Sequence, residues 1–475
     1  MEDGLDVIVV GGGFAGIAAA CRLAGDGHHP LLLERAPRLG GRASAFFSPE
    51  RNESIDYGHH VLMRCCTAAT GFLLRVGMVN AVRFQPTLSI PIAWPTGRSV
   101  LRSFPLPGIL HLAPALLGYR ALSFSDRLRV ISAGLTLSLP RAPGDVPFSE
   151  WLVRHSQSDQ AIARLWNPIC IATLNAPANA VSAQVARRVF RDALFRPDGA
   201  DMGFFTISIS DVFGAASRYI EERGGTVRKS SPVKRLLIES GRVRGVELET
   251  GETIDCDAAV CAIPPTGLPH LAGEAESLVD VVEKANRLRW SPIVNLHAWF
   301  DRSVLEDEFV VAVDSPVQAV FDVTRLQERT EDEGTTHVVL SQSAAAEWID
   351  RPFADVTDLL LDALGKLFPR ALEARCVHTL VVRHRNATFV PAPGSDQLRP
   401  PATTPIRGLY LAGDWTSTGW PSTIEGAVRS GIVAAAHAET WLTRLPETER
   451  EADADDAVSR HPHGTSPPAQ EAEAL

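Results

Sequence analysis

The feature that most constrains the fold is a glycine-rich turn close to the start of the chain. Residues 6–10 form a short run of apolar, mostly β-branched side chains, which is typical of a buried parallel strand. Gly11, Gly13 and Gly16 follow in the spacing Gly-x-Gly-x-x-Gly, and a helical pattern runs over about 14–26. Such glycines permit a tight turn, close approach of a pyrophosphate and close packing of helix on strand. The three elements together predict a dinucleotide-binding unit.

The second strand ends in an acidic residue, which extends this prediction. Residues 30–34 read as a strand that closes with Glu34, 18 residues after Gly16, where a carboxylate can bind a ribose diol. The helix N-terminus, at Phe14 and Ala15, presents free N–H groups and partial positive charge to phosphates. Because a carboxylate disfavours a 2′-phosphate, Glu34 argues against NADP at this site. The expected fold class is therefore α/β, with a Rossmann-like domain.

A second turn and a C-terminal motif decide between a nicotinamide and a flavin. Arg35 begins a stretch that reaches Gly40, Gly41 and Arg42, where the backbone can bend close to a diphosphate and an arginine can pair with it. Residues 409–412 form another buried strand, which delivers the loop that follows to a cofactor edge.

The helix predicted from about residue 423 to 442 would point its N-terminus at the N1–C2=O edge of an isoalloxazine, which gains negative charge on reduction. The candidate contacts of this motif are Gly413, Asp414, Trp420, Thr423, Ile424, Glu425 and Ala427. The two ends of the chain are thus predicted to bind the two ends of one FAD.

At this level of detail the sequence resembles the FAD-dependent amine oxidase and phytoene desaturase superfamily, up to about residue 442. Within it, the chain is most similar to the squalene-associated FAD-dependent desaturases, regarded as hydroxysqualene dehydroxylases. The narrower resemblance is carried by residues 56–60, 166–170, 174–177 and 413–427. Tyr57 and His59 stand where that family shows Asn and Gln. The resemblance implies a glutathione-reductase-like flavoprotein fold and cofactor contacts at Gly58, His59 and the backbone of Val233.

The resemblance also implies a reaction, the reductive removal of the hydroxyl of hydroxysqualene to give squalene. A general acid would protonate the departing hydroxyl, and reduced FAD would supply a hydride in a dry pocket. His60 and Asp56 are the candidate acids, although Asp56 could instead cap a loop and His60 satisfy backbone groups. Trp166, Asn167 and Asn175 are the candidate substrate contacts, the asparagines holding the hydroxyl or ordering a water.

Composition limits the partners and the compartment. The formal net charge of −10 argues against nucleic acid, because no basic excess exists to release counterions. The seven scattered cysteines contain no Cys-x-x-Cys pair, which argues against a metal site and favours a reducing cytoplasm. Residues 103–119 and 165–186 lack charge, but prolines and asparagines break them, so no spanning helix is expected. Residues 104–139 either line a tunnel that opens to the inner face of the cell membrane, as a peripheral contact, or form ordinary core.

Two interleaved domains are predicted. The FAD-binding domain comprises 1–85, 211–290 and 390–445, and a mixed-sheet α+β substrate domain comprises 86–210 and 291–389. Residues 446–475 form an acidic, Pro-rich and Ala-rich tail that is predicted to be disordered.

Three alternatives remain open. A desaturase of a carotenoid or other isoprenoid would use the same scaffold with the opposite redox direction. An amine oxidase is disfavoured because the chain has no lysine between Lys284 and Lys366, across the expected substrate sheet. A non-catalytic lipid-binding protein would have no need of Glu34 and the 413–427 motif. No second glycine fingerprint for NAD(P)H is present, so the electrons are expected from an external donor such as a flavin reductase.

Overall fold

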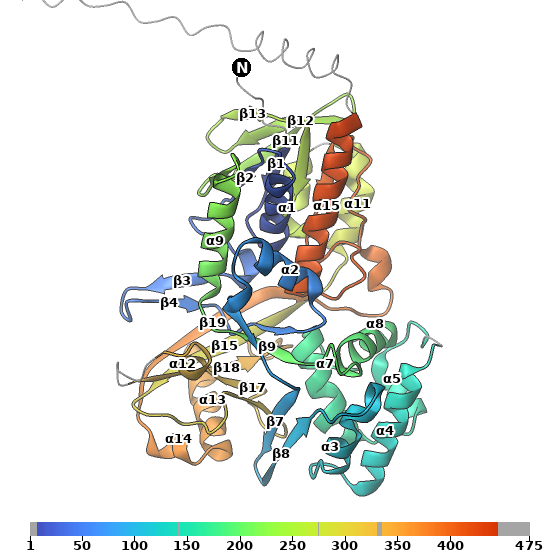
Figure 1. The fold of residues 1–475 in the computed structure, drawn as a ribbon, viewed down its shortest axis with the longest axis vertical. Helices are drawn as coiled ribbons and strands as arrows, with labels where there is room; N and C mark the ends of the chain where they lie inside the picture. Colours follow the sequence, from blue (N-terminus) through green and yellow to red (C-terminus); the bar gives the residue numbers. More distant parts are fainter. Residues whose placement is uncertain (1–6, 141–142, 274, 330–334, 445–475) are drawn as a thin grey trace, which may run out of the picture.

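The computed structural model describes residues 7–140, 143–273, 275–329 and 335–444. The predicted acidic tail at 446–475 therefore lies outside the described residues. The molecule is elongated, with a parallel sheet and long helices at one end and a mixed sheet with a cluster of helices at the other (Figure 1). The predicted α/β class with a second, mixed sheet is confirmed.

A five-stranded sheet in the order β10-β2-β1-β14-β20 forms the centre of the first end. All neighbouring strands in this sheet are parallel. The sheet combines strands from the two ends of the sequence, because β1 and β20 both pair with β14. The strands are β1 (Val7–Val10), β2 (Leu31–Leu33), β10 (Thr226–Arg228), β14 (Ala258–Cys261) and β20 (Leu409–Leu411).

Strands β2, β1, β14 and β20 are buried on both faces, because two layers cover the sheet, whereas the edge strand β10 is partly exposed. Val7 and Val9 pack among α1 (Phe14–Gly25), α9 (Ile209–Glu221) and α15 (Ile424–Arg444), which lie side by side in Figure 1. Ile8 and Val10 pack against an antiparallel meander on the other face. The meander consists of β11 (Val233–Glu239), β12 (Arg242–Leu248) and β13 (Thr253–Asp255), as the turn residues predicted.

A seven-stranded sheet in the order β19-β15-β18-β17-β16-β7-β8 spans the second end. Only β16 and β7 are paired in parallel, so the sheet is mixed. Its strands are β7 (Ser89–Trp94), β8 (Gly97–Arg102), β15 (Trp290–Phe300), β16 (Phe309–Ala312), β17 (Ala319–Asp322), β18 (Thr336–Gln342) and β19 (Cys376–Phe389). Helices α13 (Phe353–Leu367) and α14 (Arg370–Glu373) cover one face.

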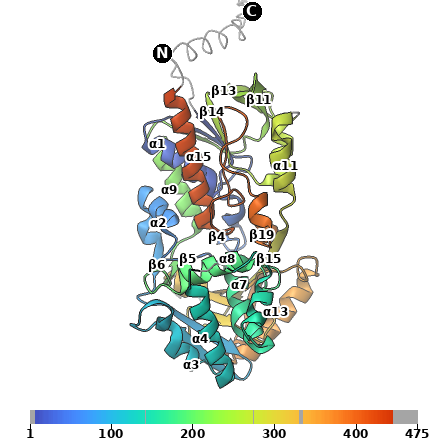
Figure 2. The same cartoon turned by 90° about the vertical axis from the view of Figure 1, so that its right-hand side faces the viewer.

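A cluster of helices packs beside this sheet, at the far end of the molecule from the meander (Figure 2). It contains α3 (Ala113–Leu117), α4 (Phe124–Ser138), α5 (Phe148–Arg154), α6 (Asp159–Ala161), α7 (Asn167–Leu174) and α8 (Ala183–Val189). The helix expected over 158–166 continues further than predicted. A π-helical turn at Ile162–Trp166 joins α6 to α7, and Pro168 is the second residue of α7, directly after this irregular turn.

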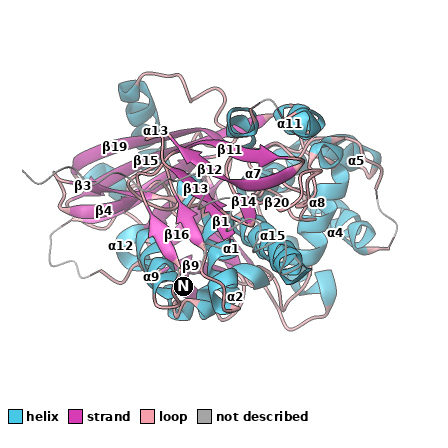
Figure 3. Cartoon of the chain, turned by 90° about the horizontal axis from the view of Figure 1, so that it is seen from above, coloured by secondary structure: helices cyan, strands magenta, loops and turns pink. Residues whose placement is uncertain are grey.

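Short elements connect the two ends. Strands β5 (Val61–Met63) and β6 (Val82–Phe84) both pair with β9 (Met202–Phe205), and β3 (Ala45–Ser48) with β4 (Glu53–Asp56) forms a hairpin. Seen from above, this hairpin lies on the opposite side of the molecule from α4, α5 and α8 (Figure 3). The remaining helices are α2 (Thr67–Arg75), α10 (Leu268–Ala272), α11 (Val279–Asn286) and α12 (Val323–Leu326).

The strands of the two large sheets lie within the two predicted domains, apart from the first residue of β15, and β9 crosses the predicted boundary by pairing with β5 and β6. The division itself stays a prediction. Among the helices of the described residues, none combines the length and apolar character needed to cross a membrane.

Candidate active site

One cavity of about 1440 Å³ runs from the glycine-rich turns into the space below the mixed sheet. Nineteen of the twenty predicted cofactor residues line it, all but Gly16. They are Gly11, Gly13, Phe14, Ala15, Glu34, Arg35, Gly40, Gly41, Arg42, Gly58, His59, Val233, Gly413, Asp414, Trp420, Thr423, Ile424, Glu425 and Ala427. Residues from the two ends of the sequence therefore share one cavity.

The three glycines of the first turn have different surroundings. A Cβ at Gly16 would lie 1.8 Å from the carbonyl oxygen of Gly11, so this glycine brings α1 against β1 and lies behind the cavity. Gly11 has φ +105°, and a Cβ there would lie 2.7 Å from the carbonyl oxygen of Ala262. At Gly13 the nearest heavy atom to such a Cβ is 4.0 Å away. The backbone at Gly13 is thus open toward the cavity, as a pyrophosphate requires.

Glu34 holds the turn in place from the end of β2. Its carboxylate accepts N–H bonds from Gly12 at 2.7 Å and from Ala36 at 2.8 Å, and the residue is buried. Each carboxylate oxygen has a further lone pair, so Glu34 can still accept a hydroxyl from a ribose. The second turn lies against the first, because the N–H of Gly40 donates to the carbonyl of Gly12 at 2.9 Å.

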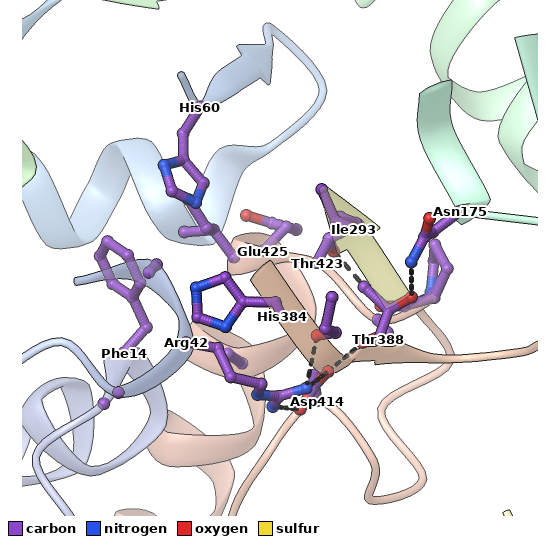
Figure 4. Close-up of a pocket in the computed structure, with 18 of the residues that line it drawn as sticks. Phe14, Arg42, His60, Asn175, Ile293, His384, Thr388, Asp414, Thr423 and Glu425 are labelled. Carbon is purple, nitrogen blue, oxygen red and sulfur yellow. Dashed lines mark hydrogen bonds and ion pairs between the residues drawn. The ribbon is translucent and has the colours of Figure 1, made fainter. Parts of the chain in front are cut away.

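Arg42 and Asp414 join the second turn to the C-terminal motif (Figure 4). Nη1 of Arg42 donates to Oδ2 of Asp414 at 3.0 Å, Nη2 donates to Oδ1, and Ser422 also donates to this carboxylate. Burial raises the pKa of Asp414, but the charge and hydrogen bonds of Arg42, with Ser422 and Arg399, outweigh it and leave the pKa below its ordinary value. Asp414 is therefore ionised and held rigidly at the cavity wall.

The start of α15 lies at the same wall. Oγ1 of Thr423 accepts the N–H of Gly426 at 3.1 Å, and so stabilises the first turn. Glu425 is fully buried, and its carboxylate accepts the N–H groups of Ala68 and Ala69 at the start of α2, at 3.1 and 2.7 Å. Glu425 lines the cavity, but its charge is engaged by α2 and by Arg429.

Three of the histidines that line the cavity are His59, His60 and His384. The rings of His60 and His384 lie between Phe14 and Ile293 in Figure 4, and His59 lines the cavity beside them. Burial and the neighbouring His60 lower the pKa of His59 to about 3, and burial and His384 lower the pKa of His60 to about 4. Burial also lowers the pKa of His384. All three rings are neutral at pH 7.

Asp56 is not among the residues that line the cavity. Its carboxylate accepts from Oγ of Ser208 at 2.6 Å and from the N–H of Ile209 at 3.1 Å, at the start of α9. Burial raises the pKa of Asp56 to about 6, against these hydrogen bonds. The geometry gives Asp56 a helix-capping position and leaves His60 as the predicted acid that faces the cavity.

The three predicted substrate contacts separate in the structure. Trp166 is buried and donates to Oε1 of Gln157 at 2.9 Å, and Oδ1 of Asn167 accepts the N–H of Ala178 at 2.9 Å, both away from the cavity lining. Asn175 lines the cavity in the left-handed conformation that ends α7. Its amide is fully used, because it donates to the carbonyl of Ser291 and to Thr388 and accepts the N–H of Ala344.

Sequence reasoning missed the four polar cavity residues on strands of the mixed sheet, namely His384, Thr388, Asn295 and Ser341. A signal was present in the strand that the sequence predicted around residues 294–300. Asn295 and His297 occupy alternate positions there, so both had to lie on one face of the strand.

The family model described as flavin containing amine oxidoreductase matches residues 14–438. Hydroxysqualene dehydroxylase of Sinorhizobium fredii is 26% identical over 448 residues, which cover 90% of this chain and 97% of that protein. The 15-cis-phytoene desaturase of Synechococcus elongatus is 23% identical over 466 residues, which cover 94% and 97%. The chloroplastic 15-cis-phytoene desaturase of an Oncidium hybrid is 26% identical, with 91% of this chain and 77% of that protein covered.

Solved structures share the fold. An oxidoreductase from Methanosarcina mazei superposes with a TM-score of 0.71 at 19% identity, covering 90% of this chain and 99% of that one. Cyclohexylamine oxidase from Brevibacterium oxydans superposes with a TM-score of 0.65 at 21% identity, covering 92% and 99%. At these identities the likeness concerns the arrangement of the backbone.

The matched family carries FAD, and the cavity residues fit this cofactor. The open backbone at Gly13 and the start of α1 suit the diphosphate, and Glu34 suits the adenosine ribose. Val233, the first residue of β11, lines the cavity, and its contact with the adenine stays a prediction. The start of α15, at Ile424, lies where it can stabilise negative charge on a reduced flavin ring.

Proposed function

Because the chain belongs to the flavin-containing amine oxidoreductase family and is an FAD-dependent oxidoreductase, we propose that it removes the hydroxyl of hydroxysqualene to give squalene. The observation that carries the proposal is the continuity of the cavity. The same space that holds the dinucleotide residues extends into a chamber walled by apolar side chains, which suits a long hydrocarbon. These include Ile90, Ile92, Leu101, Leu165, Ile169, Met202, Ile293, Phe309, Val311, Val313 and Phe321.

Reduced FAD supplies a hydride in this reaction. His60 transfers a proton to the hydroxyl oxygen, so that it leaves as water while the C–H bond forms. Since the pKa of His60 lies near 4, the ring is neutral before the reaction and must receive that proton from elsewhere. The apolar walls keep bulk water from the carbon that loses the hydroxyl. Asn175 positions Thr388 at the cavity wall through its hydrogen bond of 2.9 Å.

The substrate reaches the cavity from a membrane surface, through a peripheral contact of this otherwise cytoplasmic protein. On α4, Phe124, Leu128 and Leu135 are exposed and lie at helical spacing on one side, and Leu139 is exposed just after the helix ends. Leu106, Leu110 and Leu117 are also exposed, in the segment that precedes α4. Arg120 and Arg129 are exposed and lie close in sequence to these side chains. Although the chain as a whole carries a net charge of −10, these local positive charges favour an anionic bilayer as the partner.

The opposite, buried side of α3 and α4 faces the core that adjoins the cavity. Residues of α3 and α4 share one hydrophobic core with Leu101 and Leu165, which line the chamber. Electrons come from an external donor, such as a flavin reductase.

A direct test is to incubate reduced holoenzyme with hydroxysqualene without oxygen and to follow both the flavin spectrum and the product mass. The proposal predicts oxidised flavin and squalene in equal amounts. A flavin that stays reduced, with hydroxysqualene unchanged, would contradict it.

A desaturase of an isoprenoid chain is the second candidate, favoured by desaturase relatives of similar identity that also match nearly the whole chain. The neutral His60 also suits a group that accepts a proton. Oxidised holoenzyme mixed with phytoene distinguishes the two, because only a desaturase would reduce its flavin.

A further inference from the structure

Polar side chains continue from the cavity along the buried face of the mixed sheet. On β15, Val294, Leu296 and Ala298 pack on the side of α13, so the residues between them share the opposite face. Those residues are Asn295, His297 and Trp299. Asn295 lines the cavity, and the exposed fractions of the three are 5%, 1% and 1%. A polar row therefore leads away from the cavity through the protein interior.

His337 of the neighbouring strand β18 joins this row. Its Nε2 lies 3.0 Å from Nδ1 of His297, and its ring stacks on that of Trp299 at 4.2 Å between centroids. Two neutral imidazoles in such a contact share one proton, which one ring donates to the other. Burial lowers the pKa of His297 to about 4 and that of His337 well below its ordinary value. Both rings are therefore neutral at pH 7, and each can donate one N–H and accept one hydrogen bond.

The outer end of the row reaches the hairpin of β3 and β4. Nε1 of Trp299 donates to Oε1 of Glu53 at 3.1 Å. Glu53 also pairs with Arg329 and lies 3.6 Å from Nε of Arg51, and its side chain is 17% exposed. The charged and titratable groups that face His337 are His297, Arg329, Arg51 and His59. The row thus ends at a carboxylate in contact with solvent, whose charge balances one of the two arginines.

The inner end carries polar atoms that no other described residue satisfies. Nε2 of His59, Oδ1 of Asn295 and Nδ1 of His337 are buried without a hydrogen-bond partner in the described part of the chain. Buried polar atoms of this kind are normally satisfied by ordered water, which makes about three hydrogen bonds. His59 lies close enough to His337 to lower its pKa. Water between these atoms would complete a path from the cavity to the two stacked rings.

We propose that His59, Asn295, His297 and His337 carry protons between the cavity and the surface at Glu53, with water between them and between the imidazoles and Glu53. Water is needed for the last step because the indole of Trp299 only donates a hydrogen bond, whereas the buried Nε2 of His297 has no partner among the described residues. The inference rests on the proposed function only because the proposed reaction takes up a proton. In dehydroxylation a C–O bond breaks and a C–H bond forms, with hydride from reduced FAD and one proton taken up as the hydroxyl leaves as water. In desaturation the hydride passes to FAD and one proton is released. Either direction requires a path when a hydrocarbon fills the cavity.

The test uses His337→Phe, which keeps a ring on Trp299 but removes both nitrogens, and His337→Gln in case the first variant does not fold. Gln342→Leu is the matched control, because Gln342 is a buried polar residue of the same strand on the face that packs with Val338 and Leu340. The substrate is whichever of hydroxysqualene or phytoene reacts. Single-turnover flavin oxidation or reduction is measured in H2O and D2O.

The relay predicts that the His337 variants hold FAD with the spectrum of the wild type, turn over at least about tenfold more slowly, and show a larger solvent isotope effect. Gln342→Leu should leave both quantities unchanged. A His337 variant that retains FAD and the rate and isotope effect of the wild type would overturn the relay.

A high-resolution crystal structure of the holoenzyme gives a readout without turnover. Ordered waters bonded to Nε2 of His59 and Nδ1 of His337 are expected, and a dry contact there would overturn the relay. If neither hydroxysqualene nor phytoene reacts, the proposed function fails while this crystallographic result still decides the relay.

Discussion

Removing the guanidinium of Arg42 should destabilise the protein, because it leaves the buried carboxylate of Asp414 without its main charge partner. Breaking a buried ion pair from one side costs about 3–5 kcal/mol. The side chain of Asp414 is 5% exposed, whereas that of Arg42 is 32% exposed, so solvent replaces part of the lost interaction. We therefore expect Arg42→Met to lower the free energy of unfolding by about 3 kcal/mol, or about 150-fold in the equilibrium constant.

Arg42→Met should also reverse the way in which the contribution of Asp414 to the free energy of unfolding depends on pH. In the wild type the pKa of folded Asp414 lies below its unfolded value, so its contribution to stability is present at neutral pH and is lost as pH falls through the folded pKa. Without Arg42, burial dominates and raises that pKa above the unfolded value. The stability of Arg42→Met should then increase as pH falls from 7 to about 5, where that of the wild type does not.

Urea unfolding at the two pH values measures both effects, with FAD titration as a second readout. Arg42→Met/Asp414→Asn is the matched control, because it removes the stranded charge and should cost only about 1–2 kcal/mol. The reasoning is refuted if Arg42→Met unfolds within about 0.5 kcal/mol of the wild type, or if the double variant is the less stable of the two.

Three other substitutions test separate parts of the account. Gly16→Ala should abolish FAD binding, seen as loss of the flavin spectrum, because its Cβ meets the Gly11 carbonyl at 1.8 Å; Gly71→Ala, with nothing within 4 Å, should bind FAD normally. His60→Ala should lower turnover at least about tenfold with FAD still bound, and unchanged single-turnover rates would remove it from the mechanism. Leu128→Glu should weaken sedimentation with anionic vesicles, whereas Leu74→Glu, at a residue that is also exposed but lies on α2, should not; equal binding by both would argue against the α4 surface.

The local parts of the FAD site could be predicted because their geometry is encoded by neighbouring residues. Gly11, Gly13 and Glu34 belong to one strand, turn and helix, whose spacing follows from backbone sterics. The Gly413–Asp414 turn was found for the same reason. Its partner was not, since the pairing of Asp414 with Arg42 joins residues 372 positions apart.

The roles of side chains that contact residues far away in the sequence could not be predicted from local patterns. Asp56 lies next to the predicted catalytic turn, but its carboxylate meets the start of α9 about 150 residues later. Asn167 stands in a motif that suggests substrate, yet its side chain holds the backbone of Ala178. His297 and His337 meet only because of the register between β15 and β18, which no local pattern specifies.

The central claim is that the chain delivers a hydride from FAD to an isoprenoid carbon that loses its hydroxyl. The most direct measurement is the mass of squalene made by reduced holoenzyme in heavy water, where the transferable hydrogen of reduced FAD is exchanged for deuterium. The account predicts one deuterium per squalene, on the carbon that carried oxygen. Squalene without deuterium, or no squalene from a fully reduced enzyme, would contradict it.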